Sequence, residues 1–237
     1  MFTFLWLLLI VGSIAYYHKY IPEDIKDSNT IRKDLKPKHF LIGTLSILSV
    51  LTTGTLLIKY VPGMTFGWLT WLASKTSETQ TGQAMENSPL LWGAIVIMIL
   101  VFAVFLPKFA LLEEETFRKP YIWSNKHIQL VQSLKFGLVH LVMGIPLGAA
   151  LALSIGGIFF METATRSAKK TLDNSLAEIP KARPHDEIII HVNENIHRAE
   201  KEGIWQSTLI HTAHNYIAMG LCLTLSALLF VVQVSSA

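Results

Sequence analysis

Long apolar runs alternate with short charged segments along this chain. The apolar runs occupy residues 2–17, 40–60, 89–107, 128–162 and 205–234. A helix of about 20 apolar residues crosses a hydrocarbon core of about 30 Å. Four of the runs therefore predict one membrane-spanning helix each, whereas the run 128–162 is too long for a single straight crossing.

The fourth run contains Gly144-Ile145-Pro146-Leu147-Gly148 near its middle. Proline removes a backbone donor and biases the preceding residue away from the helix, so this sequence predicts either a kink or a tight turn between two passes. The positive-inside rule distinguishes these alternatives, because Lys and Arg concentrate in cytoplasmic loops. Segments 18–39 and 163–204 carry six and seven Lys/Arg residues, whereas 61–88 carries only Lys75. Only the hairpin puts both basic segments on one side.

The patterning thus predicts an all-α fold, a polytopic membrane helix bundle of about six passes with both termini outside. We expect N-terminal membrane helices over 1–107 and a catalytic membrane core over 108–237. The core includes a polar insertion at 163–204. Within the insertion, Ile188-Ile189-Ile190 fits either a short strand or part of an amphipathic helix.

Composition supports the membrane class. The 237 residues are 51% hydrophobic and 16% charged, with a mean hydropathy of +0.42. Soluble domains carry about 25% charged residues. No basic stripe interleaved with aromatics indicates nucleic acid as a partner, and the single cysteine, Cys222, excludes an internal disulfide. The expected surroundings are a lipid bilayer, either a bacterial plasma membrane or the endoplasmic reticulum.

Three polar clusters interrupt the apolar stretches. They are Glu113-Glu114-Glu115 with Arg118, His140 four residues after Phe136, and His211 with His214 and Asn215. Charged or imidazole groups are costly in hydrocarbon, so such residues are candidates for function. Each also has a structural explanation. The glutamates suit a helix end with i,i+4 pairs from Glu114 to Arg118 and from Glu115 to Lys119, and a lone histidine is often bonded to a carbonyl.

A functional interpretation makes one glutamate a base that takes a proton from water. Adjacent glutamates point about 100° apart on a helix, so one serves chemistry while the other pairs with Arg118. His211 and Asn215 share a helical face. Together with His140 they are suited to bind a metal or to donate hydrogen bonds to an oxyanion.

The order EExxxR, FxxxH and HxxxN, over residues 108–220, resembles the CPBP family, also called the Abi or CAAX protease family. This family of intramembrane proteases includes the type II CAAX prenyl endopeptidases. The resemblance implies that Glu113 activates the water and that Glu114 and Arg118 support the site. It also implies that His140, His211 and Asn215 stabilise the oxyanion, or that His140 and His211 bind zinc or another divalent metal.

The expected activity is hydrolysis of a peptide bond in a lipidated or membrane-tethered substrate. The alternative is a non-catalytic membrane scaffold or partner-binding protein on the same fold. An ion-coupled transporter also uses intramembrane Glu and His, but it predicts inverted repeats, which the hydropathy lacks. A further cluster, His191, Glu194 and His197 in the insertion, is predicted to be an ordinary solvated face.

Overall fold

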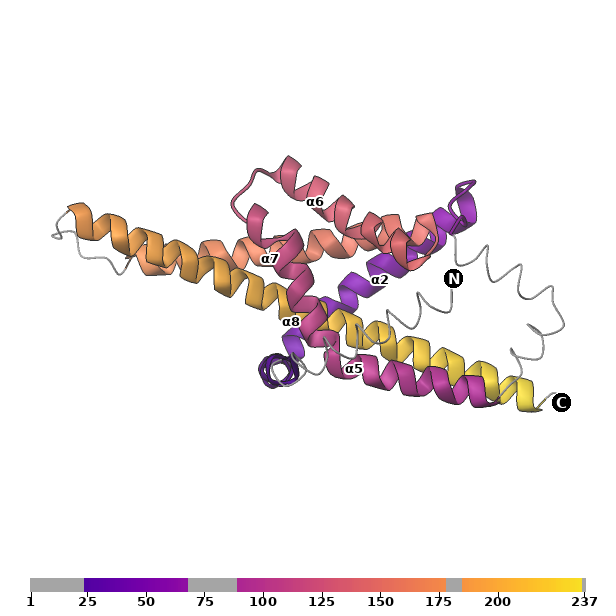
Figure 1. The fold of residues 1–237 in the computed structure, drawn as a ribbon. Coiled ribbons are helices and arrows are strands. Elements are labelled where there is room, and N and C mark those ends of the chain that lie inside the picture. Colours follow the sequence, from indigo (N-terminus) through magenta and orange to yellow (C-terminus); the bar gives the residue numbers. More distant parts are fainter. Residues whose placement is uncertain (1–23, 68–88, 178–184, 236–237) are drawn as a thin grey trace, which may run out of the picture.

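The computed structural model describes residues 24–67, 89–177 and 185–235, which fold into helices joined by turns (Figure 1). A first helix covers residues 24–34. The remaining elements are α2 (Pro37–Tyr60), α5 (Pro89–Phe117), η1 (Lys119–Tyr121), α6 (Lys126–Val139), η2 (His140–Met143), α7 (Leu147–Ala177) and α8 (His185–Ser235). The all-α prediction is confirmed for these residues.

Local sequence explains where the helices begin. Pro37 occupies the first position of α2, where its missing N–H costs nothing. The Lys36 N–H donates to Nδ1 of His39 at 3.0 Å. In α6, the Asn125 side chain accepts from the Ile128 N–H at 3.0 Å and satisfies one of the free donors of the first turn.

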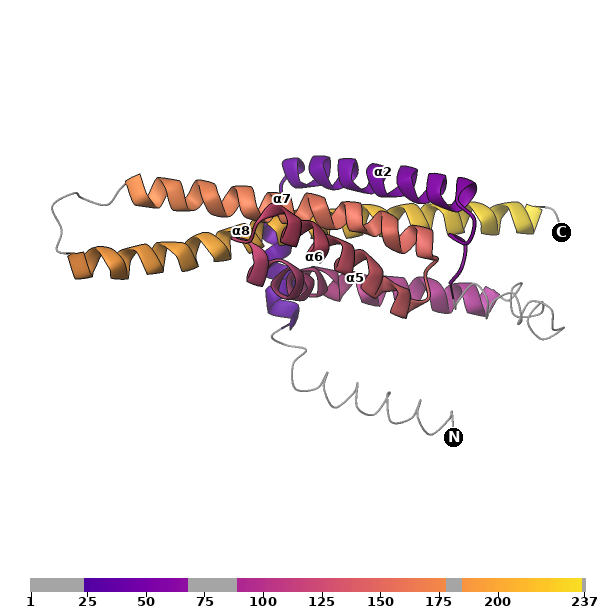
Figure 2. The same ribbon diagram turned by 90° about the horizontal axis from the view of Figure 1, so that it is seen from above.

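The bundle is built around α8, which packs against α2, α5 and α7 (Figure 2). Small residues allow the closest approaches. A Cβ at Gly203 would lie 2.5 Å from the Ala164 carbonyl oxygen of α7, and one at Gly43 would lie 2.9 Å from the His214 backbone nitrogen. Such contacts are typical of helices that associate in membranes.

A hairpin joins α6 to α7, as predicted from Gly144 and Pro146. Gly144 adopts φ +84°, a left-handed conformation that glycine reaches without strain. The two helices then pack along each other. The loop after α2 holds the start of α7, because the N–H groups of Leu147 and Gly148 donate to the carbonyls of Phe66 and Met64 at 2.8 and 2.9 Å.

The described parts of the predicted polar insertion, 163–204, belong to the two long helices α7 and α8. Residues 163–177 continue α7, and residues 185–204 begin α8, so the polar segment is the distal part of a long helical hairpin (Figure 1). Ile188-Ile189-Ile190 is helical, which excludes the strand. The 51 residues of α8 extend about 77 Å, well beyond a hydrocarbon core of about 30 Å.

Two described helices, α2 and α7, are long and apolar enough to cross a membrane. Much of α2 faces outward, with Leu41, Leu45 and Leu48 each at least half exposed. At 14 residues, α6 is shorter than the roughly 20 that a crossing needs. The six-pass prediction is therefore supported only in part, and the predicted first pass, 2–17, lies outside the described residues.

The basic segments gather at one end of the bundle. Asp34 accepts a hydrogen bond from Nε1 of Trp205 at 3.1 Å, and Lys38 borders the same groove as Lys170. The end of α2 at Tyr60 lies at the opposite end of the bundle (Figure 2). The described parts of 18–39 and 163–204 thus lie near each other, and their location on one side of a membrane stays a prediction.

Candidate active site

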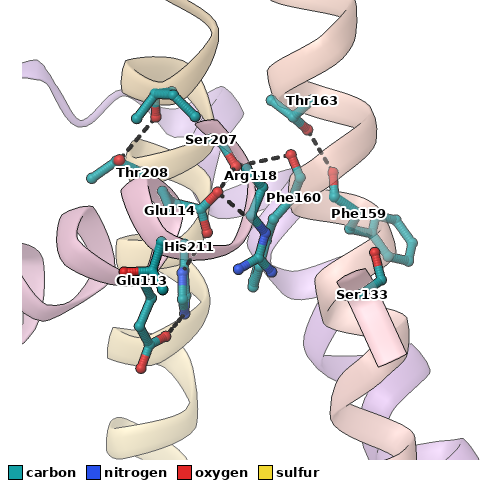
Figure 3. Close-up of polar contacts among 12 residues, drawn as sticks. Glu113, Glu114, Arg118, Ser133, Phe159, Phe160, Thr163, Ser207, Thr208 and His211 are labelled. Atoms are coloured by element: carbon teal, nitrogen blue, oxygen red, sulfur yellow. Dashed lines mark hydrogen bonds and ion pairs between the residues drawn. The ribbon is translucent and has the colours of Figure 1, made fainter. Parts of the chain in front are cut away.

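The last turn of α5 faces the middle of α8, and there the first and third predicted clusters meet. Glu114 is completely buried. Its Oε1 lies 2.8 Å from His211 Nδ1, and its Oε2 lies 2.5 Å from Ser207 Oγ (Figure 3). Ser207 Oγ is also 2.9 Å from the Phe160 carbonyl oxygen, so α5, α7 and α8 join at one point.

His211 lies between the two adjacent glutamates (Figure 3). While Nδ1 bonds Glu114, Nε2 lies 3.4 Å from Oε2 of Glu113. The Glu113 side chain is 35% exposed, whereas His211 is 3% exposed. One carboxylate therefore orients the imidazole from inside the protein, and the other reaches its far nitrogen from the surface.

Arg118 balances the charge of Glu114. Its Nε lies 3.5 Å from Glu114 Oε2, which confirms the i,i+4 pair. Its guanidinium lies 4.0 Å from the ring centre of Phe136 and 5.5 Å from that of Phe160. Nη1 and Nη2 are buried and have no hydrogen-bond partner among the described residues, so aromatic faces supply much of their environment. In the described part of the chain, no ion pair joins Glu115 to Lys119, both of which are exposed.

His140 contacts Phe136, which packs against the cluster, but among the described residues His140 makes no hydrogen bond to the glutamates or to His211. Its Nδ1 lies 2.8 Å from the Phe136 carbonyl oxygen. Since a carbonyl only accepts, Nδ1 carries the proton and Nε2 is left for another partner. The ring centres of His140 and His211 lie 5.0 and 5.6 Å from that of Phe136. The two imidazoles are therefore no farther apart than the sum of these distances.

Asn215 and His214 lie on different faces of α8. Asn215 follows His211 by one turn and is half-buried, and within the described chain no hydrogen bond links it to the glutamates. Nδ1 of the buried His214 instead pairs with Ser46 Oγ of α2 at 3.1 Å. The structure thus brings Glu113, Glu114, Arg118 and His211 into direct contact and leaves His140 and Asn215 at the periphery.

The described residues do not assemble a complete set of metal ligands. Across residues 24–67, 89–177 and 185–235, no group of three or more His, Cys, Asp or Glu side chains is placed to hold one. Nδ1 of His211 is bonded to Glu114 and Nδ1 of His140 to the Phe136 carbonyl, so Nε2 of each histidine is the nitrogen that would ligate a metal. Nε2 of His211 faces Glu113 at 3.4 Å. The mechanism proposed below assigns no step to a metal.

Sequence reasoning missed two groups of the site, Ser207 and Phe160. Ser207 precedes His211 by four residues and so shares its face, a signal that was present in the sequence. Phe160 stacks on His211 with ring centres 4.2 Å apart, but nothing in its surroundings on α7 distinguishes it from other apolar residues.

Comparison of the chain with protein-family models, with curated proteins and with solved structures finds no match.

Proposed function

We propose that this protein is an intramembrane endopeptidase in which Glu113 activates the attacking water. The observation that carries the proposal is His211 held between Glu113 at 3.4 Å and Glu114 at 2.8 Å. A buried carboxylate that orients an imidazole toward a second, accessible carboxylate is an arrangement suited to proton transfer.

The contact between Glu113 and His211 is an ion pair when Nε2 of the imidazole carries a proton. With Nδ1–H donated to Glu114, a neutral His211 instead presents the lone pair of Nε2 to Glu113. When the proton lies on His211, the Glu113 carboxylate is free to accept a proton from water.

In the proposed reaction, water adds to the peptide carbonyl and its proton passes to Glu113. The tetrahedral intermediate then collapses, the C–N bond breaks, and the proton passes to the departing amine. The negative oxygen of the intermediate needs a donor. Within the described chain, no hydrogen bond ties Asn215 to a carboxylate, and its amide N–H groups donate, so we assign this role to Asn215. His140 joins it as a donor when its imidazole is protonated at both nitrogens, because Nδ1–H already serves the Phe136 carbonyl.

Lipid-facing helices favour a substrate that arrives laterally in the membrane. We assign the chain to a multi-pass membrane protein, in either a bacterial plasma membrane or the endoplasmic reticulum. Support comes from α2 and α7, which satisfy the length and hydropathy of a span. The resemblance to CAAX proteases favours a lipidated or membrane-tethered peptide as the substrate.

The test is the variant Glu113→Gln, with Glu115→Gln as the matched control. Both remove one charge from the same helical turn, and Glu115 is exposed and outside the cluster. Cleavage of a farnesylated CAAX peptide and of an unprenylated transmembrane peptide is measured with purified protein in detergent. Losing a general base lowers the rate about 10²–10⁴-fold, so Glu113→Gln should lose turnover while Glu115→Gln keeps it. Unchanged turnover in Glu113→Gln would reject Glu113 as the base, whereas a wild-type protein that cleaves neither peptide would reject the protease in favour of a scaffold.

A further inference from the structure

A polar groove lies at the basic end of the bundle. It consists of two adjoining cavities of ≈ 250 and ≈ 360 Å³ that share Thr171, Asn174 and Glu202. The start of α2 contributes Lys38 to the groove, α7 contributes Lys170, and α8 contributes Arg198. The groove therefore joins three helices that are distant in sequence.

Its lining is suited to an anion. None of the three cations has an ion-pair partner within the described ranges, whereas Lys126 and Lys108 elsewhere on the molecule are paired. Ser167 and Thr171 add hydroxyl donors. The one carboxylate among the described lining residues, Glu202, already accepts from Nε2 of Gln206 at 3.0 Å. The groove thus has an excess of positive charge and free donors, which phosphate oxygens satisfy.

The position of the groove beside the apolar surface of α2 favours a phospholipid as the source of the phosphate. The exposed apolar residues of α2 begin with Phe40 and Leu41, two and three residues after Lys38. Trp205, a residue type enriched at the membrane interface, lies at this level with its indole N–H on Asp34. A headgroup in the groove would therefore leave its acyl chains against α2.

We propose that this groove binds the phosphate of an anionic phospholipid headgroup. The proposal rests on the membrane embedding of the protein and not on peptidase activity, so either can fail without the other. Basic pockets between membrane helices on the cytoplasmic side are a known means of binding anionic lipids.

The test is lipid binding to the purified full-length chain in detergent, followed by native mass spectrometry. Phosphatidylglycerol and phosphatidylcholine with the same acyl chains are titrated separately. We expect phosphatidylglycerol to bind at least about tenfold more tightly. The triple variant Lys38→Gln, Lys170→Gln and Arg198→Gln should lose about 100-fold in affinity, at about fivefold for each cation.

The matched control is Lys33→Gln, Lys135→Gln and Lys169→Gln, which removes the same charge from exposed positions outside the groove. It should retain wild-type affinity within about threefold. Arg198→Gln alone, at an exposed position, should weaken binding about fivefold and covers the case in which the triple variant misfolds. Equal losses in groove and control variants, or equal binding of the two lipids, would overturn the proposal. Complete displacement of the lipid by millimolar inorganic phosphate would also overturn it, in favour of a soluble phosphate.

Discussion

Glu113 and Glu114 are neighbours in the chain but occupy different environments. The Glu113 side chain is 35% exposed and that of Glu114 is 0% exposed. Successive residues of a helix point about 100° apart, so one turn of α5 presents one carboxylate to the interior and one to the surface. This division assigns the structural role to Glu114 and the chemical role to Glu113.

The buried pair of Glu114 and Arg118 should dominate local stability. Removing one member of a buried ion pair costs about 3–5 kcal/mol, because the other charge is left without its partner. We expect Glu114→Gln to lower the free energy of unfolding by nearly this amount. Glu115→Gln, at an exposed position on the same turn, should change it by less than about 0.5 kcal/mol. Denaturant unfolding in detergent measures both, and equal effects would contradict the role of Glu114.

At the scale of the element, α5 contains a proline that removes one backbone hydrogen bond, and side chains of other helices replace the missing donor. Pro107 has no N–H, so the Ala103 carbonyl lacks its helical donor. The Tyr216 hydroxyl of α8 donates to that carbonyl at 3.3 Å, and Arg32 Nη2 lies 3.4 Å from it. Nε of Arg32 also donates to the Tyr216 oxygen at 2.9 Å.

A double-mutant cycle tests this substitute for a helical hydrogen bond. Tyr216→Phe should cost about 1 kcal/mol of unfolding free energy, because the carbonyl loses a donor. In a Pro107→Ala background the new backbone N–H at position 107 becomes available to the same carbonyl, so Tyr216→Phe should cost less. Identical costs in the two backgrounds would show that the hydroxyl does not serve the Ala103 carbonyl.

Close packing between α7 and α8 depends on Gly203. A Cβ there would lie 2.5 Å from the Ala164 carbonyl oxygen and 2.7 Å from Cδ1 of Ile122. Gly203→Ala should therefore lower the unfolding free energy by about 1–3 kcal/mol, as overpacking does. At Gly220, on the same helix, an added Cβ meets no described atom within 4 Å. Gly220→Ala should be neutral or stabilising by up to about 1 kcal/mol, and a Gly203→Ala variant as stable as this control would refute the close contact.

At the scale of the whole molecule, apolar run length predicted where helices lie better than where they end. The run 40–60 became α2, and Gly144 with Pro146 marked the hairpin. The continuation of α7 and α8 through 163–177 and 185–204 was missed because these residues are polar. Trp123 bonds Glu200 of α8 and Lys126 bonds Glu162 of α7, so the segment that leads into α6 contacts both helices.

The sequence predicted several residues of the site, but it did not predict which of them contact each other across helices. Spacing of four residues places side chains on one helical face, but it does not say which helix that face meets. Glu114 with Arg118 followed from spacing within α5, whereas the contact of Glu114 with His211 joins positions 97 residues apart. Phe160, which stacks on His211, is an apolar residue, and its sequence surroundings did not mark it as part of the site.

The arrangement of the basic segments predicts sidedness in the membrane. With Cys222 replaced by Ser, single cysteines at Lys33 and Lys169 should be labelled by an impermeant reagent from the same face. A cysteine at Val61, at the far end of α2, should be labelled from the other face (Figure 2). All three positions are exposed. Labelling of positions 33 and 169 from opposite faces would contradict a common cytoplasmic side.

Peptide hydrolysis in water enriched in ¹⁸O tests the assignment of Glu113 most directly. A membrane-tethered peptide is incubated with the purified protein, and the new carboxyl terminus is weighed by mass spectrometry. We expect a product that carries one ¹⁸O atom from solvent, and a rate that falls about 10²–10⁴-fold in Glu113→Gln but not in Glu115→Gln. A labelled product formed equally fast by wild type and Glu113→Gln would contradict the proposed role of this carboxylate.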